Sequence, residues 1–477
     1  MRSAFILGLV AIAGCASSPS YRSPALQVPT SFREARDTAG GASYVAVMTS
    51  TSVSESVHQA PRSNYWEQLG DTTLNRLIAD LVRANQDVQA AEARVRATRS
   101  ERTRTLLDLT PDTRFTGSYA RQRLSSASFP GFPGSFPDQS IWDAGVSASW
   151  DLDVFGQIRH TAQARGAMVG VAQEELRDVQ VSLTAELALT YFALRGAQEQ
   201  LSVARENADN QRRTFNIARE RLEAGRGSAF DTERAQAQLS TTLASIPARE
   251  AQVAAAQYRI GVLVGQPPTA VAAELDQPVR IPALPDIASI GSPEAVVRTR
   301  PDVAAAERQA AAQGALVGAA KSSYLPKISI GGSAGYVAPE FRAVGDQGTL
   351  RYAVGPVISW PLLSLGRVKA DVDAAEAQED AARSHYRAVV LSAMEDLEVS
   401  ISRYRAARQR LDRLEEASVA SQHAAQLALL RFTEGATDLL QVLDAQRTQL
   451  EAQDRLAQAR IDAGAAYAAL FRAIGGP

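Results

Sequence analysis

Three groups of residues in this sequence have types and spacings that could support chemistry. Asp151 and Asp153 lie two residues apart and could act as a paired-carboxylate acid/base site. The segment GGSAG at 331–335 matches the GxSxG pattern, in which Ser333 would be a hydrolase nucleophile. Asp444 stands alone among aliphatic residues in the segment LLQVLDAQ. Which of these roles is possible depends on the elements that carry the residues.

The GGSAG segment lacks the context of a nucleophile elbow. That motif needs a strand, a sharp turn and an immediate helix, followed by an acid and a histidine. Here the motif lies within a predicted strand and leads through YVAPEF into a loop. Glycines in a strand allow close packing or a bend. We therefore disfavour the hydrolase interpretation and predict no catalytic residue.

Composition argues against several other classes of function. The chain has a single cysteine, Cys15, which excludes an intrachain disulfide framework and a cysteine-rich metal site. The four histidines show no ligand spacing, and HExxH does not occur, so we expect no metal site. A formal net charge of −2 argues against nucleic acid as a partner. We expect no cofactor other than a covalent lipid.

The N-terminus predicts export and lipidation. Arg2 precedes the apolar run AFILGLVAIAG, which is too short to span a membrane and has the build of a signal peptide. The run ends in IAGC, which resembles a bacterial lipobox in which Cys15 is acylated and becomes the mature N-terminus. The alternative is a cleaved secretory signal with an incidental cysteine. No aspartate follows Cys15, which in lipoproteins of diderm bacteria implies delivery to the outer membrane. An acyl chain anchors a protein but does not span the bilayer.

The chain is a tandem duplication. Trp150 and Trp360 lie 210 residues apart, and the same offset relates Gly225 to Gly435 and many other pairs between them. Further upstream the offset is 215 residues, as between Pro111 and Pro326. A longer loop between the strands of the first copy accounts for the difference. Each copy therefore repeats one order of elements: a helix, a strand pair and a long helical hairpin.

The strand pairs are recognised by their alternation. In WDAGVSASWDLDVF, apolar residues from Trp142 to Val154 line one face, and the other face carries Asp151 and Asp153. Such a pattern suits a transmembrane barrel strand that is apolar toward lipid and polar toward the lumen, so both aspartates are predicted to line the lumen. The alternative is a half-buried strand of a soluble sheet. The segments 124–140 and 338–350 would be extracellular loops.

Helical periodicity follows Gly156 and Gly366. Residues 157–224 contain no proline, so an unbroken helix there would be about 100 Å long. Single helices are also predicted over 71–108 and 293–323, and Pro247 predicts a kink or a change of packing partner in the first return helix. The predicted chain begins with a signal peptide (1–14) and a lipidated extended segment (15–64). The first copy follows, with its first helix (65–112), strand pair (113–155) and helical hairpin (156–265). A Pro-rich linker (266–292) leads to the second copy, with its first helix (293–326), strand pair (327–365) and helical hairpin with the C-terminus (366–477).

These motifs together resemble one family, the TolC-like outer-membrane factors of tripartite efflux pumps. The similarity is to the lipoprotein branch that partners resistance–nodulation–division transporters. The matching segments cover essentially residues 65–475: YWEQLGDTTLNRLI (65–78), SWDLDVFGQIR (149–159), IPARE (246–250), LVGQPP (263–268), RPDVAAAE (300–307), SYLPKISIGGS (323–333) and LLQVLDAQR (439–447). Each segment alone is weak evidence for the family, and their order along the chain makes the resemblance specific.

The resemblance implies a mainly α fold with a β-barrel part. Long helical hairpins of a homotrimer would form an α-barrel in the periplasm, and four strands per protomer would contribute to a 12-stranded outer-membrane β-barrel. Four strands cannot close a barrel alone, because open edges in lipid leave backbone groups unsatisfied. The implied partners are outer-membrane lipid, a periplasmic adaptor protein and an inner-membrane efflux transporter.

The resemblance also assigns roles to the two helical breaks. The hairpin tips, which would contact the adaptor, are Gly225, Gly227, Ser228, Gly435, Thr437 and Asp438. Leu440 and Asp444 share one helix face, and they match the family position that forms the periplasmic gate. A second acidic residue found in some relatives is Gln441 here, and in the first copy the position of Asp444 is Arg234. Only the second hairpin would therefore carry the gate.

The predicted function is a passive outer-membrane exit duct for drugs or other toxic small molecules, with no enzymatic activity. Two alternatives belong to other classes. A GxSxG hydrolase is disfavoured by the strand context of Ser333. A periplasmic coiled-coil lipoprotein that tethers structures would explain the long helices and Cys15. It would not explain the two amphipathic strand pairs or the duplication.

Overall fold

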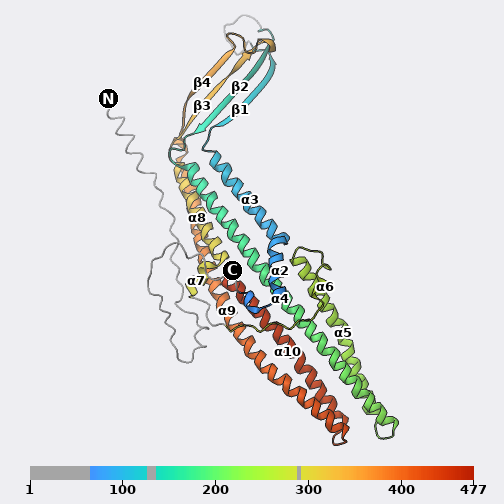
Figure 1. Ribbon diagram of the computed structural model, residues 1–477. Helices are drawn as coiled ribbons and strands as arrows, with labels where there is room; N and C mark the ends of the chain where they lie inside the picture. Colours follow the sequence, from blue (N-terminus) through green and yellow to red (C-terminus); the bar gives the residue numbers. More distant parts are fainter. Residues whose placement is uncertain (1–64, 126–135, 287–291, 477) are drawn as a thin grey trace. The chain divides into compact units, whose positions relative to one another are not determined.

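The computed structural model describes residues 65–125, 136–286 and 292–476 (Figure 1). Cys15 and the predicted signal peptide and lipidated segment lie outside the described residues, so their assignments remain predictions. The chain divides into two compact units. One contains Arg94–Gln173 and Ala305–Arg387, and the other contains Glu174–Ala304, Ala388–Pro477 and the described part of Ala25–Ala93.

The first unit contains one four-stranded antiparallel sheet in the order β1-β2-β3-β4. Its strands are β1 (Asp112–Gln122), β2 (Gln139–Asp151), β3 (Lys327–Ala338) and β4 (Leu350–Ser359). In this register Asp112 lies opposite Ser149, and Trp142 lies opposite Ala338. The middle pairing, β2 with β3, joins the first repeat to the second. Strands β1 and β4 are the two edges of the sheet.

One face of the sheet is apolar and exposed. Val146 is exposed on β2, as are Tyr352, Val354 and Ile358 on β4. Large exposed apolar side chains in a regular strand pattern mark a surface that contacts something other than water. The face with the opposite parity carries mainly polar side chains and glycines, among them Asp143, Ser147 and Asp151 of β2.

The same tryptophan hydrogen bond occurs in both repeats. Trp150 donates from Nε1 to the carbonyl oxygen of Leu109 at 2.8 Å, and Trp360 donates to that of Tyr324 at 3.0 Å. The tryptophans are 210 residues apart and their acceptors 215, as the two sequence offsets require. Each bond satisfies a carbonyl just after a helix end, where no helical partner is available. The duplication is thus present in the structure at the level of single atoms.

Each predicted first helix is two helices. The first copy has α2 (Thr72–Ala84) and α3 (Gln86–Leu107), and the second has α7 (Pro293–Thr299) and α8 (Pro301–Ser322). The prediction of continuous helices over 71–108 and 293–323 was therefore wrong. Asn85 and Arg300 have extended backbones at the breaks, with ψ values of 134° and 131°. Pro301 explains the second break, because a residue before proline avoids the helical region.

The Asn85 break has a different local cause. Its Oδ1 accepts hydrogen bonds from the backbone N–H groups of Asp87 at 2.8 Å and Val88 at 3.2 Å, which starts α3. Its Nδ2 donates to the carbonyl oxygen of Leu263 at 2.8 Å. In the second repeat, Arg300 donates from Nη1 to the carbonyl oxygen of Ala473 at 2.9 Å. Residues 85 and 300 are 215 apart, and residues 263 and 473 are 210 apart. The side chains at the two breaks therefore bind equivalent carbonyl groups, at the ends of the return helices of the two hairpins.

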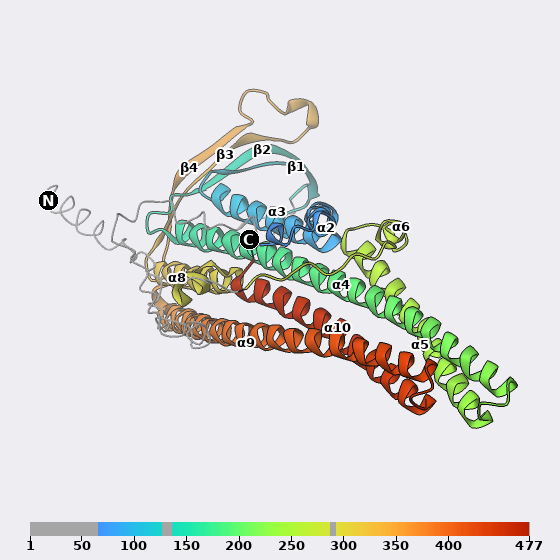
Figure 2. The same cartoon turned by 60° about the horizontal axis from the view of Figure 1, so that its bottom comes forward.

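The long hairpins are built from α4 (Gln157–Glu223) with α5 (Ala229–Leu263) and α9 (Leu365–Thr433) with α10 (Leu439–Ile474). Figure 2 shows α5 returning along α4 and α10 returning along α9. Pro247 lies inside α5, which continues through it. The remaining helices are α6 (Ala272–Leu275) and the 3-10 turns η3 (Glu67–Leu69), η5 (Phe341–Ala343) and η6 (Leu362–Ser364). Among the described residues, every helix is too short or too polar to cross a bilayer.

The core of the second unit is a set of buried aromatic and aliphatic side chains. Tyr191 and Phe192 of α4 are fully buried, as is Tyr404 of α9, and Tyr467 of α10 is 2% exposed. Tyr65 stacks on Tyr467 with ring centroids 4.5 Å apart and donates its hydroxyl to the Tyr467 carbonyl at 2.9 Å. Burial of these large aromatic surfaces stabilises the unit.

Candidate functional site

The two hairpin turns share one glycine geometry. Gly225 and Gly435 have left-handed φ values of 69° and 76°. The N–H of Gly225 donates to the Leu222 carbonyl at 2.9 Å, and that of Gly435 donates to the Phe432 carbonyl at 3.0 Å. Such a C-terminal turn favours glycine because other residues are strained at positive φ. The predicted tip glycines are thus required by the turns themselves.

The remaining tip residues start the return helices. Ser228 caps α5, since its Oγ accepts from the Phe230 N–H at 3.2 Å, and Asp438 caps α10, since its Oδ1 accepts from the Gln441 N–H at 3.1 Å. Thr437 hydrogen bonds through Oγ1 to the Gln441 side chain at 2.5 Å. At Gly227 a β-carbon would lie 2.7 Å from the Leu222 nitrogen, which excludes a larger side chain. A contact with an adaptor stays a prediction for all of them.

Leu440 and Asp444 lie on the exposed face of α10. Leu440 is 46% exposed and the Asp444 side chain 63% exposed. The adjacent face of the same turns is buried, where Val442 and Leu443 belong to the cluster that contains Phe432. An exposed leucine one turn from an exposed carboxylate is free to meet equivalent side chains of other copies. Their role as a gate stays a prediction.

Arg447 changes the electrostatics of Asp444. Its Nη2 lies 2.8 Å from Asp444 Oδ1, one turn further along α10. The carboxylate therefore carries a paired cation on the same exposed face, which the sequence prediction of an isolated acidic residue did not include. Because both groups are largely exposed, water and salt screen this pair and it adds little stability.

Arg221 connects the two tips and was not identified from the sequence. Its Nη2 donates to the carbonyl oxygens of Phe432 at 2.8 Å and Thr433 at 3.3 Å, at the end of α9. The guanidinium carbon also lies 4.1 Å from the centroid of the Phe432 ring. These contacts satisfy helix-terminal carbonyls and hold the first hairpin against the second.

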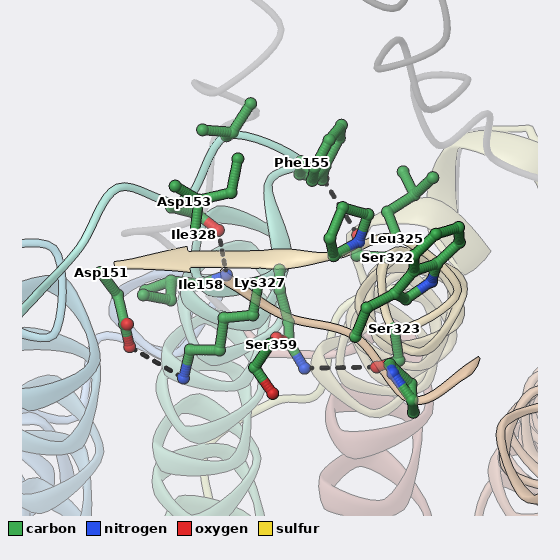
Figure 3. A pocket seen from close by; sticks show the side chains of 15 residues that line it. Asp151, Asp153, Phe155, Ile158, Ser322, Ser323, Leu325, Lys327, Ile328 and Ser359 are labelled. Carbon is green, nitrogen blue, oxygen red and sulfur yellow. Dashed lines mark hydrogen bonds and ion pairs between the residues drawn. The ribbon is translucent and has the colours of Figure 1, made fainter. Parts of the chain in front are cut away.

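The predicted lumen residues lie beside a cavity of about 320 Å³ where strands and helices of the first unit meet (Figure 3). Asp151 ends β2, and its Oδ2 lies 2.8 Å from Nζ of Lys327, which begins β3. Asp143, on the same face of β2, is 2.6 Å from Arg351. The acidic side chains of this strand face are therefore matched by basic ones. Lumen lining by Asp151 stays a prediction.

Asp153 is not on the strand face, and that assignment was wrong. Strand β2 ends at Asp151, and the Asp153 side chain is only 4% exposed. Its carboxylate accepts from the backbone N–H groups of Ile158 at 2.9 Å and Arg159 at 3.0 Å, so it caps the start of α4. The alternation in the sequence continues past the end of the strand, which is why the pattern misplaced this residue.

Ser333 lies within β3, opposite Ser147 on β2 and Ala353 on β4. The strand continues to Ala338, so the sharp strand-to-helix turn of a nucleophile elbow is missing at this serine. In the part of the chain that the structure describes, no cluster of three or more His, Cys, Asp or Glu residues could hold a metal ion.

Comparisons with known proteins agree with this architecture. The family model described as outer membrane efflux protein matches residues 77–266 and 293–476. Nodulation protein T of Rhizobium leguminosarum bv. viciae is 27% identical over 459 residues, covering 94% of this chain and 88% of that protein. The toluene efflux pump outer membrane protein TtgF of Pseudomonas putida is 27% identical over 470 residues, covering 98% and 95%. The solved structure of the outer-membrane channel OprN is 34% identical, with a TM-score of 0.84 over 97% of this chain and 99% of that one.

Proposed function

The chain belongs to the outer membrane efflux protein family, and from this premise we propose that it is the exit duct of a tripartite pump and works as a homotrimer. The predicted mainly α fold with a small sheet is confirmed by the likeness to OprN. The protein is located in the outer membrane and takes part in efflux, and its family consists of channels. That this particular chain catalyses no reaction is part of the proposal.

The sheet edges support the homotrimer. Strands β1 and β4 each lack a neighbour on one side within the described part of the chain, and an open sheet edge cannot face lipid because its backbone groups would be unsatisfied. Pairing β4 of one copy with β1 of the next removes every edge. Three copies of four strands would give the 12-stranded barrel.

A periplasmic adaptor and an inner-membrane transporter complete the proposal. The duct has no energy source of its own, so a pump must drive the cargo into it. The turns around Gly225 and Gly435 are where we place the adaptor contact, because they are the two solvent-exposed hairpin ends of the second unit. The cargo class is a drug, solvent or other toxic small molecule, as in the toluene pump relative.

Leu440 and Asp444 are proposed to close the resting duct. Three copies of Asp444 would form a ring of carboxylates that favours cations, and Leu440 would form an apolar ring one turn away. The supporting observation is that both side chains are exposed on one helix face while the adjacent face is buried. Replacing both by alanine should raise the single-channel conductance. Unchanged conductance would show that the gate lies elsewhere.

Cys15 is proposed to carry the lipid anchor, on the basis of the IAGC sequence. Replacing Cys15 by serine should abolish labelling with radioactive palmitate. Labelling that persists in this variant would exclude Cys15 as the acylated residue.

The observation that carries the proposal is the amphipathic sheet with two open edges in a chain of this family. Purified protein should run as a heat-modifiable trimer and conduct ions in a planar bilayer. A periplasmic tether, the alternative from a different class, would be shown by a non-conducting protein that stays in the lipid-anchored fraction without forming heat-modifiable oligomers.

A further inference from the structure

The two repeats contact each other directly within the first unit. Strand β2 of repeat one pairs with β3 of repeat two, with Ser147 opposite Ser333. The helices that flank these strands also touch: Gln157, the first residue of α4, donates from Nε2 to Oγ of Ser323, just after α8, at 3.3 Å. The start of a helix from repeat one thus meets the end of a helix from repeat two.

The sequence offsets map this internal contact onto a contact between copies. Positions in β2 and α4 correspond to positions 210 residues later, in β4 and α9. Positions in β3 and α8 correspond to positions 215 residues earlier, in β1 and α3. If copies associate through their free edges, as the proposed homotrimer requires, α9 of one copy should meet α3 of the next as α4 meets α8. This inference rests on the proposed function.

At the mapped positions the neutral hydrogen bond is replaced by opposite charges. Gln157 corresponds to Arg367, and Ser323 corresponds to Asp108. We propose that Arg367 of each copy forms an ion pair with Asp108 of the partner subunit, at the junction between the strands and helices. Both residues are exposed in the isolated chain. Among the described residues, neither side chain has an ion-pair partner.

Each of these charges lies at the unfavourable end of its own helix. Asp108 directly follows Leu107, the last residue of α3, and its N–H still bonds to the Arg104 carbonyl at 3.2 Å. A carboxylate there faces the negative end of the helix dipole. Arg367 is the third residue of α9, where the dipole is positive. Pairing the two across the interface offsets both unfavourable interactions, which gives a physical reason for their presence.

The surroundings of the pair are also complementary. The Ser322 hydroxyl donates to the Phe155 carbonyl at 3.1 Å in the internal contact. The corresponding residues are Leu107 and Leu365, which are 59% and 39% exposed. Two exposed leucines brought together by the same geometry would exclude water from one side of the ion pair. Burial of their apolar surface would then contribute to association.

The mapping also fixes the strand register between copies. Ser147 opposite Ser333 becomes Val357 of one copy opposite Ser118 of the partner subunit. A shift by one residue would place every side chain of the strand on the other face of the sheet. The strand register and the ion pair therefore follow from the same sequence offsets, and each can be tested by its own cross-linking experiment.

Cysteine cross-linking in outer membranes tests the pair. The variant with Arg367→Cys and Asp108→Cys should form disulfide-linked dimers and trimers on non-reducing gels, and reductant should return them to monomers. Each single-cysteine variant controls for products that involve the native Cys15. The mismatched variant with Arg367→Cys and Arg104→Cys, one helical turn away, should give little product. A mismatched product stronger than the matched one would overturn the proposed geometry.

Charge exchange and the strand pair give independent evidence. Arg367→Asp and Asp108→Arg should each lower the temperature at which the trimer dissociates, and the double exchange should restore it. The variant with Val357→Cys and Ser118→Cys should cross-link in the same register, even if the charge variants assemble poorly. A conducting trimer that cross-links at neither pair overturns this inference alone. A protein that is monomeric by native mass spectrometry and non-conducting overturns the proposed homotrimer itself.

Discussion

The Arg221 guanidinium donates a hydrogen bond to the Phe432 carbonyl oxygen at 2.8 Å and lies 4.1 Å from the centroid of the same residue's ring. One side chain of the first hairpin thereby holds the end of α9 in the second. Both contacts lie one turn or less from the glycine turns at residues 225 and 435. The two tips are consequently coupled, although their return helices carry different residues.

Replacing Arg221 by alanine should uncouple the tips. The lost hydrogen bond and cation–π contact together contribute on the order of 1–2 kcal/mol at this partly exposed site. We expect faster proteolysis within the turns and a higher resting conductance, with the proposed trimer intact. Arg431→Ala is the matched control, because residue 431 occupies the equivalent position in the second repeat. Equal effects from the two variants would show that the tips are not coupled through Arg221.

Arg447 should moderate the cation selectivity that we propose for Asp444. Asp444→Asn is expected to reduce the preference of the duct for cations, because the proposed ring of carboxylates would be lost. Arg447→Ala is expected to increase that preference, because the 2.8 Å ion pair no longer offsets the carboxylate. Reversal potentials in a salt gradient across a planar bilayer measure both effects. Arg234→Ala, at the matching position of repeat one, should leave the reversal potential unchanged.

Asp153 should affect stability and leave selectivity unchanged. Asp153→Ala removes the cap of α4 and should lower the free energy of unfolding by about 0.5–2 kcal/mol. Asp153→Asn retains an acceptor oxygen and should lose less. Neither variant should change the reversal potential, because the carboxylate is buried. A change in selectivity with Asp153→Asn would restore the original assignment of this residue to the lumen.

The sequence was sufficient for features that depend on local pattern. Helical spacing and the glycines at 225 and 435 predicted the long hairpins and their turns, and alternation predicted the strands. Asp153 was misplaced because the alternation runs past the last paired residue, and pairing is decided by the neighbouring strand. The break at Asn85 was missed because its side chain is held by Leu263, 178 residues away. The Arg221 contact likewise joins residues 211 apart, a distance at which no local pattern applies.

Arg300 should be the more sensitive of the two equivalent break residues. It is 7% exposed, it donates to the Ala473 carbonyl at 2.9 Å, and it pairs with Asp302 at 2.7 Å and Asp396 at 3.3 Å. Removing it leaves the Ala473 carbonyl without its donor and Asp302, whose side chain is 35% exposed, without its cation, so Arg300→Ala should cost about 2–4 kcal/mol. Asn85→Ala removes neutral hydrogen bonds and should cost about 1–3 kcal/mol. Urea unfolding followed by circular dichroism compares the two, and a larger loss at Asn85 would contradict this ranking.

The same cluster predicts a defined dependence of stability on pH. Burial alone would raise the pKa of the Asp302 carboxyl, but the hydrogen bonds and charge of Arg300 lower it below its usual value. A depressed folded-state pKa contributes stability above the unfolded pKa, which is about 3.9 for aspartate, and this contribution is lost as the pH falls through the folded value. Unfolding measured between about pH 2 and 6 should therefore show a smaller pH dependence in Asp302→Asn than in the native protein.

Asp178 acts in the opposite sense, because burial and then the charge of Asp302 raise its pKa, so its protonation favours the folded state as the pH falls. Asp178→Asn should consequently steepen the acid loss of stability relative to the native protein. An Asp302→Asn curve as steep as that of the native protein would show that Asp302 is not held by Arg300 in solution.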